Sequence, residues 1–589
     1  MPTESFFTQS SLAYIASAGA GKDGKAYSIK PSDGTGDFTF SRGSNLAATR
    51  VGADGLIEKG RENLVTYSNT FSSWTSINST LTSNQAGYDG TNDAWLIEKT
   101  ADAGRIQNNV AAGLATYSVY AKAGSASWLR LLKGANASAY FDLSNSTIGN
   151  LSLTIDATIT SVGNGWYRCT ITYQDQYAGS VRIYPALANN DTTGTSGNIL
   201  IQDAQVEVGL AATEYIESGA TKGTAGLLES EPRFDYSNGA SCPSLLLEPS
   251  RRNFIEQSEY FGSYINYGSA DTANSTISVE GVNNATLIVG NGTQNQVYTA
   301  SPDISVTSAG LYTLSIFAKK GTNNYFRLYL DGFAGSSNNG AYFDLLNGST
   351  PTSGASIKDY GNGWYKCSIT ATIVSGDLVG KLAFNVTPNT NSVFFSSASE
   401  ANGKNIYIYG ATLEAGSYPT SYIPTYGTSQ TRAADVCGGA GDASTFNDAE
   451  GVLYAECKTL SATTGQYIMI NDGTASNEVL MYFSTTSDRI TVVYQHDGLA
   501  NSYQQNISGI NKTNMNKYAL RWGVNNFAFF VNGVKVNEQL SGTVGTGNNF
   551  NQITFSNVSG SVNFLGDVKQ VLTFNTALSD ADLATLTTI

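Results

Sequence analysis

Hydrophobic and polar residues alternate in short runs along most of the chain, and clusters of Gly, Asn, Asp and Ser separate the runs. In GNGWYKCSIT (361–370), Tyr365, Cys367 and Ile369 fall on one side of the alternation. A period of two residues is typical of a strand with one buried face. The Asn-Gly pair before it suits a tight turn whose residues have positive φ. The pattern predicts many short strands joined by turns, and therefore a mostly β protein.

The same turn and strand occur twice in the chain. Trp166 in VGNGWYRCTIT (162–172) corresponds to Trp364, and the block AYFDL also recurs. Other blocks recur in the same order, and their spacing changes only in patches rich in Gly, Asn and Ser, where loops tolerate insertions. Two homologous domains, predicted at 61–222 and 250–430, explain this repetition.

The remainder of the chain differs in sequence from this repeat. Residues 431–589 are predicted as a third domain, in which FAFFVNGVKVNEQL (527–540) predicts a hairpin and Ser579 is a natural N-cap for one helix. Residues 1–60 are predicted as an anchoring segment and 223–249 as a connector. The expected fold is mostly β, with three consecutive β-sandwich (jelly-roll) domains after a short N-terminal anchor segment.

The segments that precede the three domains resemble one another. They begin near Phe40, Phe234 and Tyr422 and contain Leu, Ile and Pro as well as Gly and Ser. This composition favours ordered connectors over flexible tethers.

Charge and hydropathy argue against several classes of binding partner. The net charge is −14 and the pI is near 4.6, which argues against nucleic acid and anionic membranes as partners. The first residues have no basic region followed by an apolar region, so we expect no signal peptide. No stretch of 18 or more apolar residues occurs, so we expect no membrane insertion.

The candidate catalytic residues are few. His496 is the one histidine, which leaves neither a Ser-His-Asp triad nor a site with several histidines. A glycosidase needs only two carboxylates, and Glu207/Glu414 and Asp142/Asp344 recur in the two copies. We interpret these as structural carboxylates or calcium ligands, and expect that the protein is not an enzyme.

Three acidic turns and the five cysteines are the remaining candidate metal ligands. DGTGD (33–37), YDGTND (88–93) and NDGTASNE (471–478) cluster hard oxygen ligands, but none has the EF-hand pattern. We favour simple turns, leave a structural calcium ion open and expect no other cofactor. The five cysteines lack metal-binding spacing, and the repeated pair, Cys169 and Cys367, is interpreted as two small buried hydrophobic residues.

Sugar-binding surfaces combine aromatic faces with groups that fix hydroxyls. Trp128 and Tyr325 correspond in the two copies, and each precedes an arginine, Arg130 or Arg327, by two residues. That spacing places each aromatic and its arginine on one strand face. The alternative interpretation is that these aromatics pack in the core. The aromatic candidates are Trp74, Trp95, Trp128, Tyr325 and Trp522.

Several phrases resemble a known family. The stretches at 33–58, 245–261 and 420–436, together with the GNGWY blocks, resemble bacteriophage head- and tail-fibre proteins built from carbohydrate-binding-module-like sandwiches. NFLGDVKQVLTFNTALSDADLATL (563–586) resembles concanavalin A/laminin-G-like sandwiches. The resemblance implies a homotrimeric virion fibre protein, of head or tail, assembled in the host cytoplasm. It further implies that the N-terminal segment docks on other virion proteins and that the sandwiches bind host surface glycans.

Two alternatives stay open at this point. A structural capsid or tail decoration protein would bind no glycan, and a polysaccharide depolymerase would release reducing sugars. Tailspike depolymerases are more often β-helices, and no regular short repeat of that kind is present.

Overall fold

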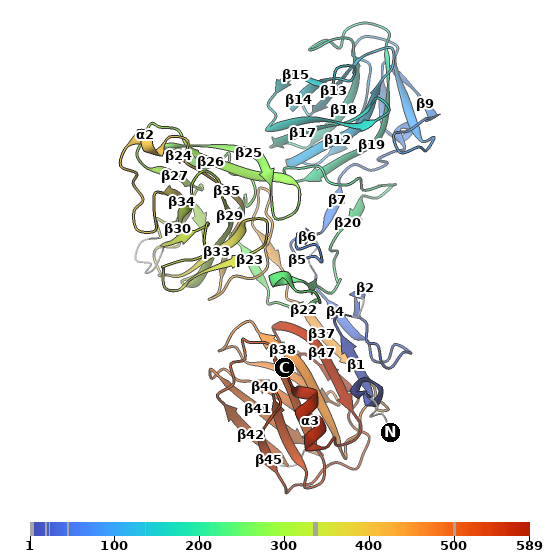
Figure 1. Cartoon of the computed structure of the whole chain (residues 1–589). Helices are drawn as coiled ribbons and strands as arrows, with labels where there is room; N and C mark the ends of the chain where they lie inside the picture. Colours follow the sequence, from blue (N-terminus) through green and yellow to red (C-terminus); the bar gives the residue numbers. More distant parts are fainter. Residues whose placement is uncertain are drawn as a thin grey trace.

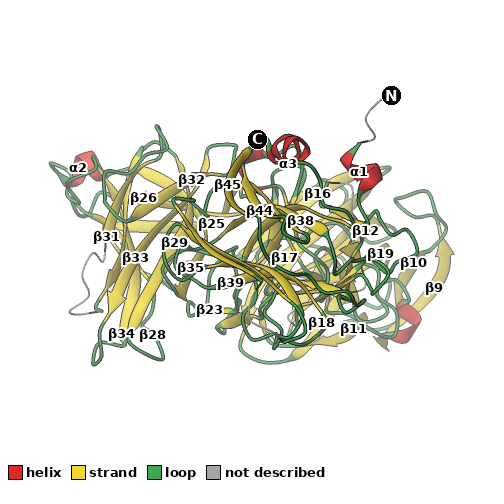
Figure 2. Ribbon diagram, turned by 90° about the horizontal axis from the view of Figure 1, so that it is seen from below, coloured by secondary structure: helices red, strands yellow, loops and turns green. Residues whose placement is uncertain are grey.

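Three β-sandwiches surround a central region of connecting segments in the computed structural model of the chain (Figure 1). The structure describes residues 5–17, 21–22, 24–43, 46–135, 137–333, 340–498 and 502–589. The mostly β fold class is confirmed. Short helical segments lie at the margins of the strands (Figure 2): α1 (Phe6–Gln9), α2 (Ala398–Ala401), α3 (Asp580–Thr587), η1 (Phe71–Ser73) and η2 (Ser237–Gly239).

The first sandwich consists of two antiparallel six-stranded sheets. The first sheet has the order β16 (Asp156–Gly163), β17 (Trp166–Asp175), β12 (Gly113–Ala123), β19 (Asn198–Val208), β10 (Ala94–Lys99) and β9 (Ser79–Gln85). The second has the order β15 (Thr147–Ser152), β14 (Ala137–Asp142), β13 (Trp128–Lys133), β18 (Gly179–Ala186), β11 (Arg105–Val110) and β8 (Thr75–Ile77).

The second sandwich repeats this topology. One sheet has the order β32 (Ala355–Asp359), β33 (Trp364–Ile373), β29 (Gly310–Lys320), β35 (Asn405–Ala415), β26 (Asn283–Gly290) and β25 (Ser269–Ile277). The other has the order β31 (Gly340–Asp344), β30 (Tyr325–Asp331), β34 (Val379–Thr387), β27 (Val297–Ala300) and β24 (Ile265–Tyr267), with β28 (Ile304–Ser305) beside β34.

The two sandwiches also share the register in which their strands pair. Lys122 lies opposite Trp166 across β12 and β17, and Lys319 lies opposite Trp364 across β29 and β33. The Asn-Gly turns before both tryptophans have positive φ at each residue, as the sequence predicts. The prediction that the two repeated cysteines are buried is also confirmed, because both lie in the sandwich cores.

The C-terminal sandwich is built from both ends of the chain. One sheet has the order β21 (Phe234–Asp235), β22 (Ser244–Leu247), β47 (Gly566–Phe574), β38 (Gly451–Thr459), β43 (Asn516–Trp522), β44 (Phe527–Val531) and β45 (Val534–Gln539), with β1 (Leu12–Ile15) also paired to β47. The other has the order β2 (Gly21–Lys22), β3 (Lys25–Ala26), β4 (Phe38–Ser41), β37 (Val436–Ala440), β46 (Gln552–Thr554), β39 (Gln466–Asn471), β40 (Glu478–Phe483), β41 (Arg489–Gln495) and β42 (Tyr503–Ser508).

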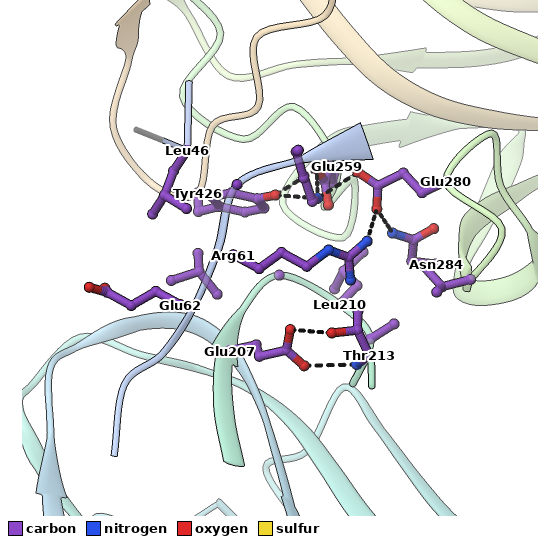
Figure 3. Close-up of a pocket in the computed structure, with 16 residues that line it drawn as sticks. Leu46, Arg61, Glu62, Glu207, Leu210, Thr213, Glu259, Glu280, Asn284 and Tyr426 are labelled. Carbon is purple, nitrogen blue, oxygen red and sulfur yellow. Dashed lines mark hydrogen bonds and ion pairs between the residues drawn. The ribbon is translucent and has the colours of Figure 1, made fainter. Parts of the chain in front are cut away.

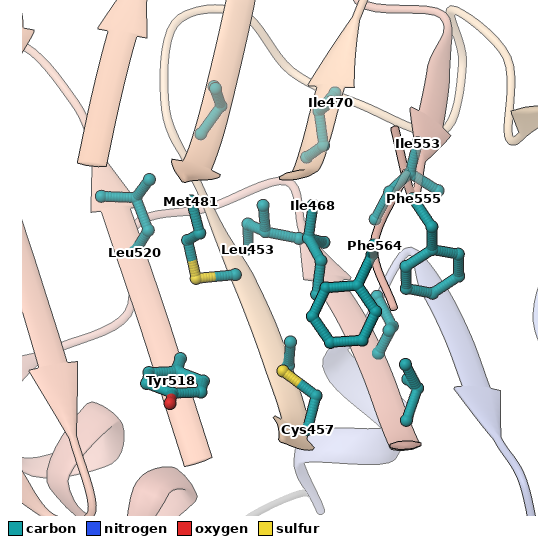
Figure 4. Packing of buried hydrophobic residues seen from close by; sticks show 14 of the residues in the cluster. Leu453, Cys457, Ile468, Ile470, Met481, Tyr518, Leu520, Ile553, Phe555 and Phe564 are labelled. Atoms are coloured by element: carbon teal, nitrogen blue, oxygen red, sulfur yellow. The ribbon is translucent and has the colours of Figure 1, made fainter. Parts of the chain in front are cut away.

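The core of this sandwich packs side chains from both sheets against each other. Figure 4 shows Ile468 and Met481 of one sheet facing Leu453 and Leu520 of the other, with Cys457 among them. The predicted hairpin turns at Asn-Gly between β44 and β45. Helix α3 begins after the predicted N-cap, whose hydroxyl accepts a hydrogen bond from the backbone of Asp582.

The N-terminal residues do not form a separate unit. Leu12 and Tyr14 are fully buried in the core of the C-terminal sandwich, and strand β4 pairs with β37. The first residues therefore complete a domain that lies more than 400 positions later in the sequence. Docking of residues 1–60 on another virion protein stays a prediction, but the segment has a structural partner within the chain.

Three two-stranded pairs join the sandwiches. They are β5 (Thr49–Val51) with β6 (Ile57–Lys59), β7 (Arg61–Asn63) with β20 (Gly223–Ala225), and β23 (Arg251–Asn253) with β36 (Gln430–Arg432). Figure 1 shows them in the space between the sandwiches. The prediction of ordered connectors is confirmed.

The connectors meet in a buried ionic cluster, here called the arginine junction: Arg42, Arg233, Glu248, Arg432 and Asp435. Arg233 and Arg432 each place Nη1 within 3 Å of Glu248 Oε2, at 2.7 and 2.9 Å. Arg42 Nη1 lies 3.3 Å from Asp435 Oδ1, and Arg233 also pairs with Asp435. All five side chains are at most 4 % exposed. Each connector contributes one of the arginines, so the junction ties the three segments together.

Candidate functional site

The predicted pair in the first sandwich lies on the outer face of β13. Trp128 and Arg130 are half-buried there, whereas Leu129 and Leu131 point into the core. The shared face follows from the period of two along the strand. Sugar binding by this pair stays a prediction.

The outer face around Arg130 is already filled by the protein's own side chains. The guanidinium carbon of Arg130 lies 5.2 Å from the ring centroid of Tyr140 and 5.5 Å from that of Tyr184. The guanidinium carbon of Arg105 also lies 5.6 Å from the ring centroid of Tyr184. Both tyrosines are buried. These contacts are cation–π interactions that hold the sheet face together, and they leave little aromatic surface for a ligand.

The second sandwich has a related arrangement on β30. Tyr325 and Arg327 are half-buried on the outer face, and Arg327 lies 4.2 Å from the ring of Tyr329 and 5.8 Å from that of Tyr342. The Arg–Tyr stack is therefore a repeated feature of both sandwiches. It stabilises a sheet face whether or not a ligand binds there.

The prediction for Trp522 is wrong as a stacking surface. Its side chain is 1 % exposed and lies in the core of the C-terminal sandwich, and its indole Nε1 donates a hydrogen bond to the Asn447 carbonyl at 3.1 Å. The residue lies on β43, a central strand, and faces the opposite sheet. A central inward position puts its ring out of reach of a ligand on the surface.

Other tryptophans also serve packing. Trp166 and Trp364 are 1 % exposed, so the repeated pair packs in the interior of the two sandwiches. Trp74 is buried and donates its indole N–H to the Tyr67 carbonyl. Trp95 is half-buried and donates its indole N–H to the Asn69 carbonyl.

The repeated carboxylates are structural, as the sequence favours. Glu207 accepts hydrogen bonds from the Thr213 N–H and hydroxyl, and Glu414 accepts the same two bonds from Thr420. The Asp142/Asp344 pair likewise caps equivalent turns after β14 and β31.

One group of paired carboxylates lies between the first two sandwiches (Figure 3). Lys59 Nζ lies 2.9 Å from Glu259 Oε1 and 2.7 Å from Glu280 Oε1, and Tyr426 donates its hydroxyl to Glu259 at 2.8 Å. The cavity beside them measures about 30 Å³, room for little more than a water molecule. Ion pairing and the small volume make this cluster a structural joint between sandwiches.

The metal expectation remains untested. In the acidic turns, Asp33, Asp89 and Asp472 each accept hydrogen bonds from the threonine two residues later, which is ordinary turn chemistry. Within the described ranges, no three His, Cys, Asp or Glu side chains are placed to hold a metal ion. His496 is buried just after β41 and contacts Thr543 and the turn residue Asp497.

A large open groove lies on the outer face of β39, β40 and β41 in the C-terminal sandwich. Its volume is about 700 Å³. Tyr467 and Tyr482 lie opposite each other across β39 and β40, with ring centroids 4.7 Å apart and planes inclined by 30°. Met469, Leu480 and Val493 form an apolar floor outside the main core. The groove therefore offers an aromatic platform beside a hydrophobic strip.

Polar groups surround this platform. Thr491 and Gln504 come from β41 and β42, and Asn557 and Ser559 from the loop after β46. Glu478 lies at one end, where burial and the nearby Asp472 raise its pKa to about 7. Among the described residues that line the groove, none is a lysine or arginine. The surface is thus apolar and aromatic at the centre, with amides, hydroxyls and one carboxyl at the margin.

Sequence reasoning missed this groove for a physical reason. In QYIMIN (466–471) and EVLMYF (478–483), both faces of the strand carry large apolar residues. Such runs indicate a strand buried on both faces and do not reveal an open one. The available signal was the tyrosine pair, which only the register of β39 and β40 brings together.

Comparisons with known proteins give similar structures but no family. No protein-family model and no curated protein matches the sequence. The CBM40 of Ruminococcus gnavus IT-sialidase bound to α2,3-sialyllactose is similar over 26 % of this chain and 88 % of its own, with 20 % identity and a TM-score of 0.22. The tandem CBM22 domain of Paenibacillus barcinonensis Xyn10C is similar over 64 % of this chain and 100 % of its own, with 11 % identity and a TM-score of 0.21.

A third similar structure is mouse laminin α1, domains LG4-5. It covers 49 % of this chain and 90 % of its own, with 11 % identity and a TM-score of 0.17. TM-scores this low leave the functional argument to the residues of the chain itself. Among the described helices, none has the length and hydropathy needed to cross a bilayer.

Proposed function

We propose that the protein is a non-enzymatic glycan-binding protein, and that the groove over β39–β41 is its principal binding surface. The observation that carries the proposal is the open pair of Tyr467 and Tyr482 above an apolar floor. Ligand sites are typically concave and largely apolar, with a few polar groups that fix orientation. The C–H face of a pyranose ring is apolar and stacks on such rings, while its hydroxyls need amides and hydroxyls like those at the margin.

The charge of the groove favours neutral or amino-bearing sugars over acidic ones. Glu478 is the ionisable carboxyl on the described lining, and no cationic side chain offsets it there. An acidic sugar would therefore be repelled once Glu478 is charged, above pH of about 7. We propose neutral or amino-bearing glycans as the ligands.

The wider role that we propose is attachment of a bacteriophage particle to its host. The resemblance of the connector phrases to head- and tail-fibre proteins supports this role, as does the mostly β architecture. In a homotrimer held by other virion proteins, several weak glycan contacts would act together, because tethered sites raise the effective concentration. Location in the virion is part of the same proposal.

The test uses the full-length protein and a set of neutral and acidic bacterial polysaccharides. Tyr467→Ala and Tyr482→Ala should each weaken binding about fivefold or more, because each removes one aromatic contact worth about 1 kcal/mol beyond its buried area. Tyr177→Ala is the matched control, since Tyr177 is 76 % exposed in the first sandwich. Unchanged binding in both groove variants would overturn the assignment. No binding to any polysaccharide would favour a decoration protein, and release of reducing ends would indicate a depolymerase.

A further inference from the structure

A second cavity lies at the centre of the molecule, where the connectors meet the second and C-terminal sandwiches. Its volume is about 180 Å³. The two flanking sandwiches provide Lys358 and Lys366 on one side and Lys458 and Asp567 on the other. The connectors provide the remaining wall, including Asp235. We call this space the junction cavity, because it shares Glu248 with the arginine junction.

Two ammonium groups in the junction cavity lack a carboxylate partner. Lys366 is 6 % exposed, and its Nζ donates one hydrogen bond, to the Thr420 carbonyl at 2.5 Å. The Nζ of Lys358, half-buried on β32, lies 5.4 Å from the ring of Tyr360. Within the described part of the chain, no carboxylate oxygen lies within 4.0 Å of either amine. Glu414 and Glu248 act on Lys366 only from beyond that distance, and Asp235, Asp567 and Glu248 act on Lys358 in the same way.

The carboxylates around the cavity already have partners. Asp567 lies 2.8 Å from Lys458, and Glu248 is held by two arginines of the arginine junction. Asp235 accepts hydrogen bonds from the backbone of Val51 and Ser237. Glu414, the carboxylate whose charge acts most strongly on Lys366, accepts hydrogen bonds from the Thr420 N–H and hydroxyl.

Other buried lysines in the chain are better satisfied. Lys59 pairs with two glutamates, and Lys99 and Lys512 each donate to two backbone carbonyls. Burial lowers the pKa of Lys366 to about 8 and also lowers that of Lys358. A buried cation without a direct ion pair is costly, so two such amines that line one cavity indicate room for a compensating group.

We propose that the junction cavity binds a small oxyanion, a phosphate or a carboxylate, between Lys358 and Lys366. The volume exceeds that of a cavity able to hold benzene, so an anion of four or five heavy atoms fits with some water. The hydroxyls of Ser356 and Ser368 are 2.7 Å apart on the same wall and hydrogen-bond to each other, so one of the two can donate to a bound anion. All four side chains belong to the second sandwich, and the connectors close the cavity on the opposite side. An anion that binds only the folded chain stabilises it by mass action.

The experiment is isothermal titration of the full-length protein with inorganic phosphate, at constant ionic strength set with chloride. The expected result is saturable binding of one phosphate per chain and a matching rise in the midpoint of thermal unfolding. Lys358→Met and Lys366→Met should weaken phosphate binding at least tenfold. Lys320→Met is the matched control, because Lys320 is exposed on the same sandwich; it should bind as the wild type does.

Competition with acetate and sulfate distinguishes the two sources of oxyanion. Displacement by acetate alone would assign the site to carboxylates, and displacement by sulfate alone to tetrahedral anions. Either result supports the site. The proposal is overturned if the wild type shows no saturable binding, or if Lys358→Met, whose half-exposed side chain should be replaceable without unfolding, binds phosphate as well as the control does.

Discussion

At the scale of single residues, two buried asparagines hold the connectors to their sandwiches. The Asn253 amide nitrogen donates to the carbonyls of Ala411 and Ile423, and its oxygen accepts from the backbone of Ile255 and Leu413. Asn63 makes the corresponding four bonds in the first sandwich. One side chain thus satisfies four backbone groups in each copy.

Replacing this amide should destabilise the second sandwich. Asn253→Ala leaves buried backbone groups without partners, which we expect to cost about 3 kcal/mol. The measurement is urea unfolding of the full-length protein, followed by the intrinsic fluorescence. Asn109→Ala is the control, because Asn109 is exposed on β11. Equal stability of the two variants would contradict the role of Asn253.

Residue identity alone predicted only part of the candidate site. The sequence places Trp128 and Arg130 on one strand face, because the period of a strand is local information. It does not show that Tyr140 and Tyr184 cover that arginine, since their positions depend on pairing between β13, β14 and β18. The groove tyrosines were missed for the same reason.

At the scale of elements, the unusual feature is the pairing of β1 with β47. The repeat, the hairpin in 527–540 and the final helix were all predictable, because each has a local signal in turn residues or capping. The pairing of a strand near residue 12 with one near residue 573 has no local signal. Such non-local pairing depends on which sheet edge remains unpaired after the rest of the domain has formed.

A charged residue in β1 should therefore damage the distant C-terminal sandwich. Leu12→Asp buries an unpaired carboxylate in its core and should cost about 3 kcal/mol or more. Hydrogen exchange should show faster exchange of the β47 amides, residues 566–574. Leu153→Asp, at a side chain that is 73 % exposed, should change nothing. Normal protection of β47 in Leu12→Asp would contradict the structural role of the N-terminal segment.

At the scale of the whole molecule, the arginine junction sets the arrangement of the sandwiches. Burial of charge is compensated there by ion pairs shared among segments far apart in the sequence. Removing one partner of a buried ion pair leaves the other charge without compensation. The junction should thus behave as a cooperative unit.

Asp435→Ala should loosen the arrangement of the three sandwiches. The expected cost is about 3–5 kcal/mol, because two buried arginines lose their shared carboxylate. Limited proteolysis should then cut the connectors faster than in the wild type. Asp303→Ala is the control, because the Asp303 side chain is 67 % exposed and forms its ion pair with Lys381 at the surface. Identical cleavage of both variants would show that the junction does not hold the connectors.

The junction also predicts a dependence on pH. Burial alone would raise the pKa of Glu248, but its ion pairs with Arg432 and Arg233 outweigh burial and hold that pKa well below its ordinary value. A depressed carboxyl pKa stabilises the folded state fully above the pKa of the unfolded chain, near 4.3, and this stabilisation is lost gradually as the pH falls from there toward the depressed pKa of the folded state. Small-angle X-ray scattering should show a compact particle from pH 7 to 5 and expansion toward pH 3. A radius of gyration that stays constant down to pH 3 would contradict this.

Mapping where a bound glycan protects the protein is the most direct test of glycan binding in the groove over β39–β41. Hydrogen exchange would be measured on the full-length protein with and without a polysaccharide that it binds. We expect added protection in β39 and β40, residues 466–471 and 478–483, and loss of that protection in the Tyr467→Ala variant. Protection confined to β13 or β30, or binding with no change over 466–483, would contradict the assignment of the groove.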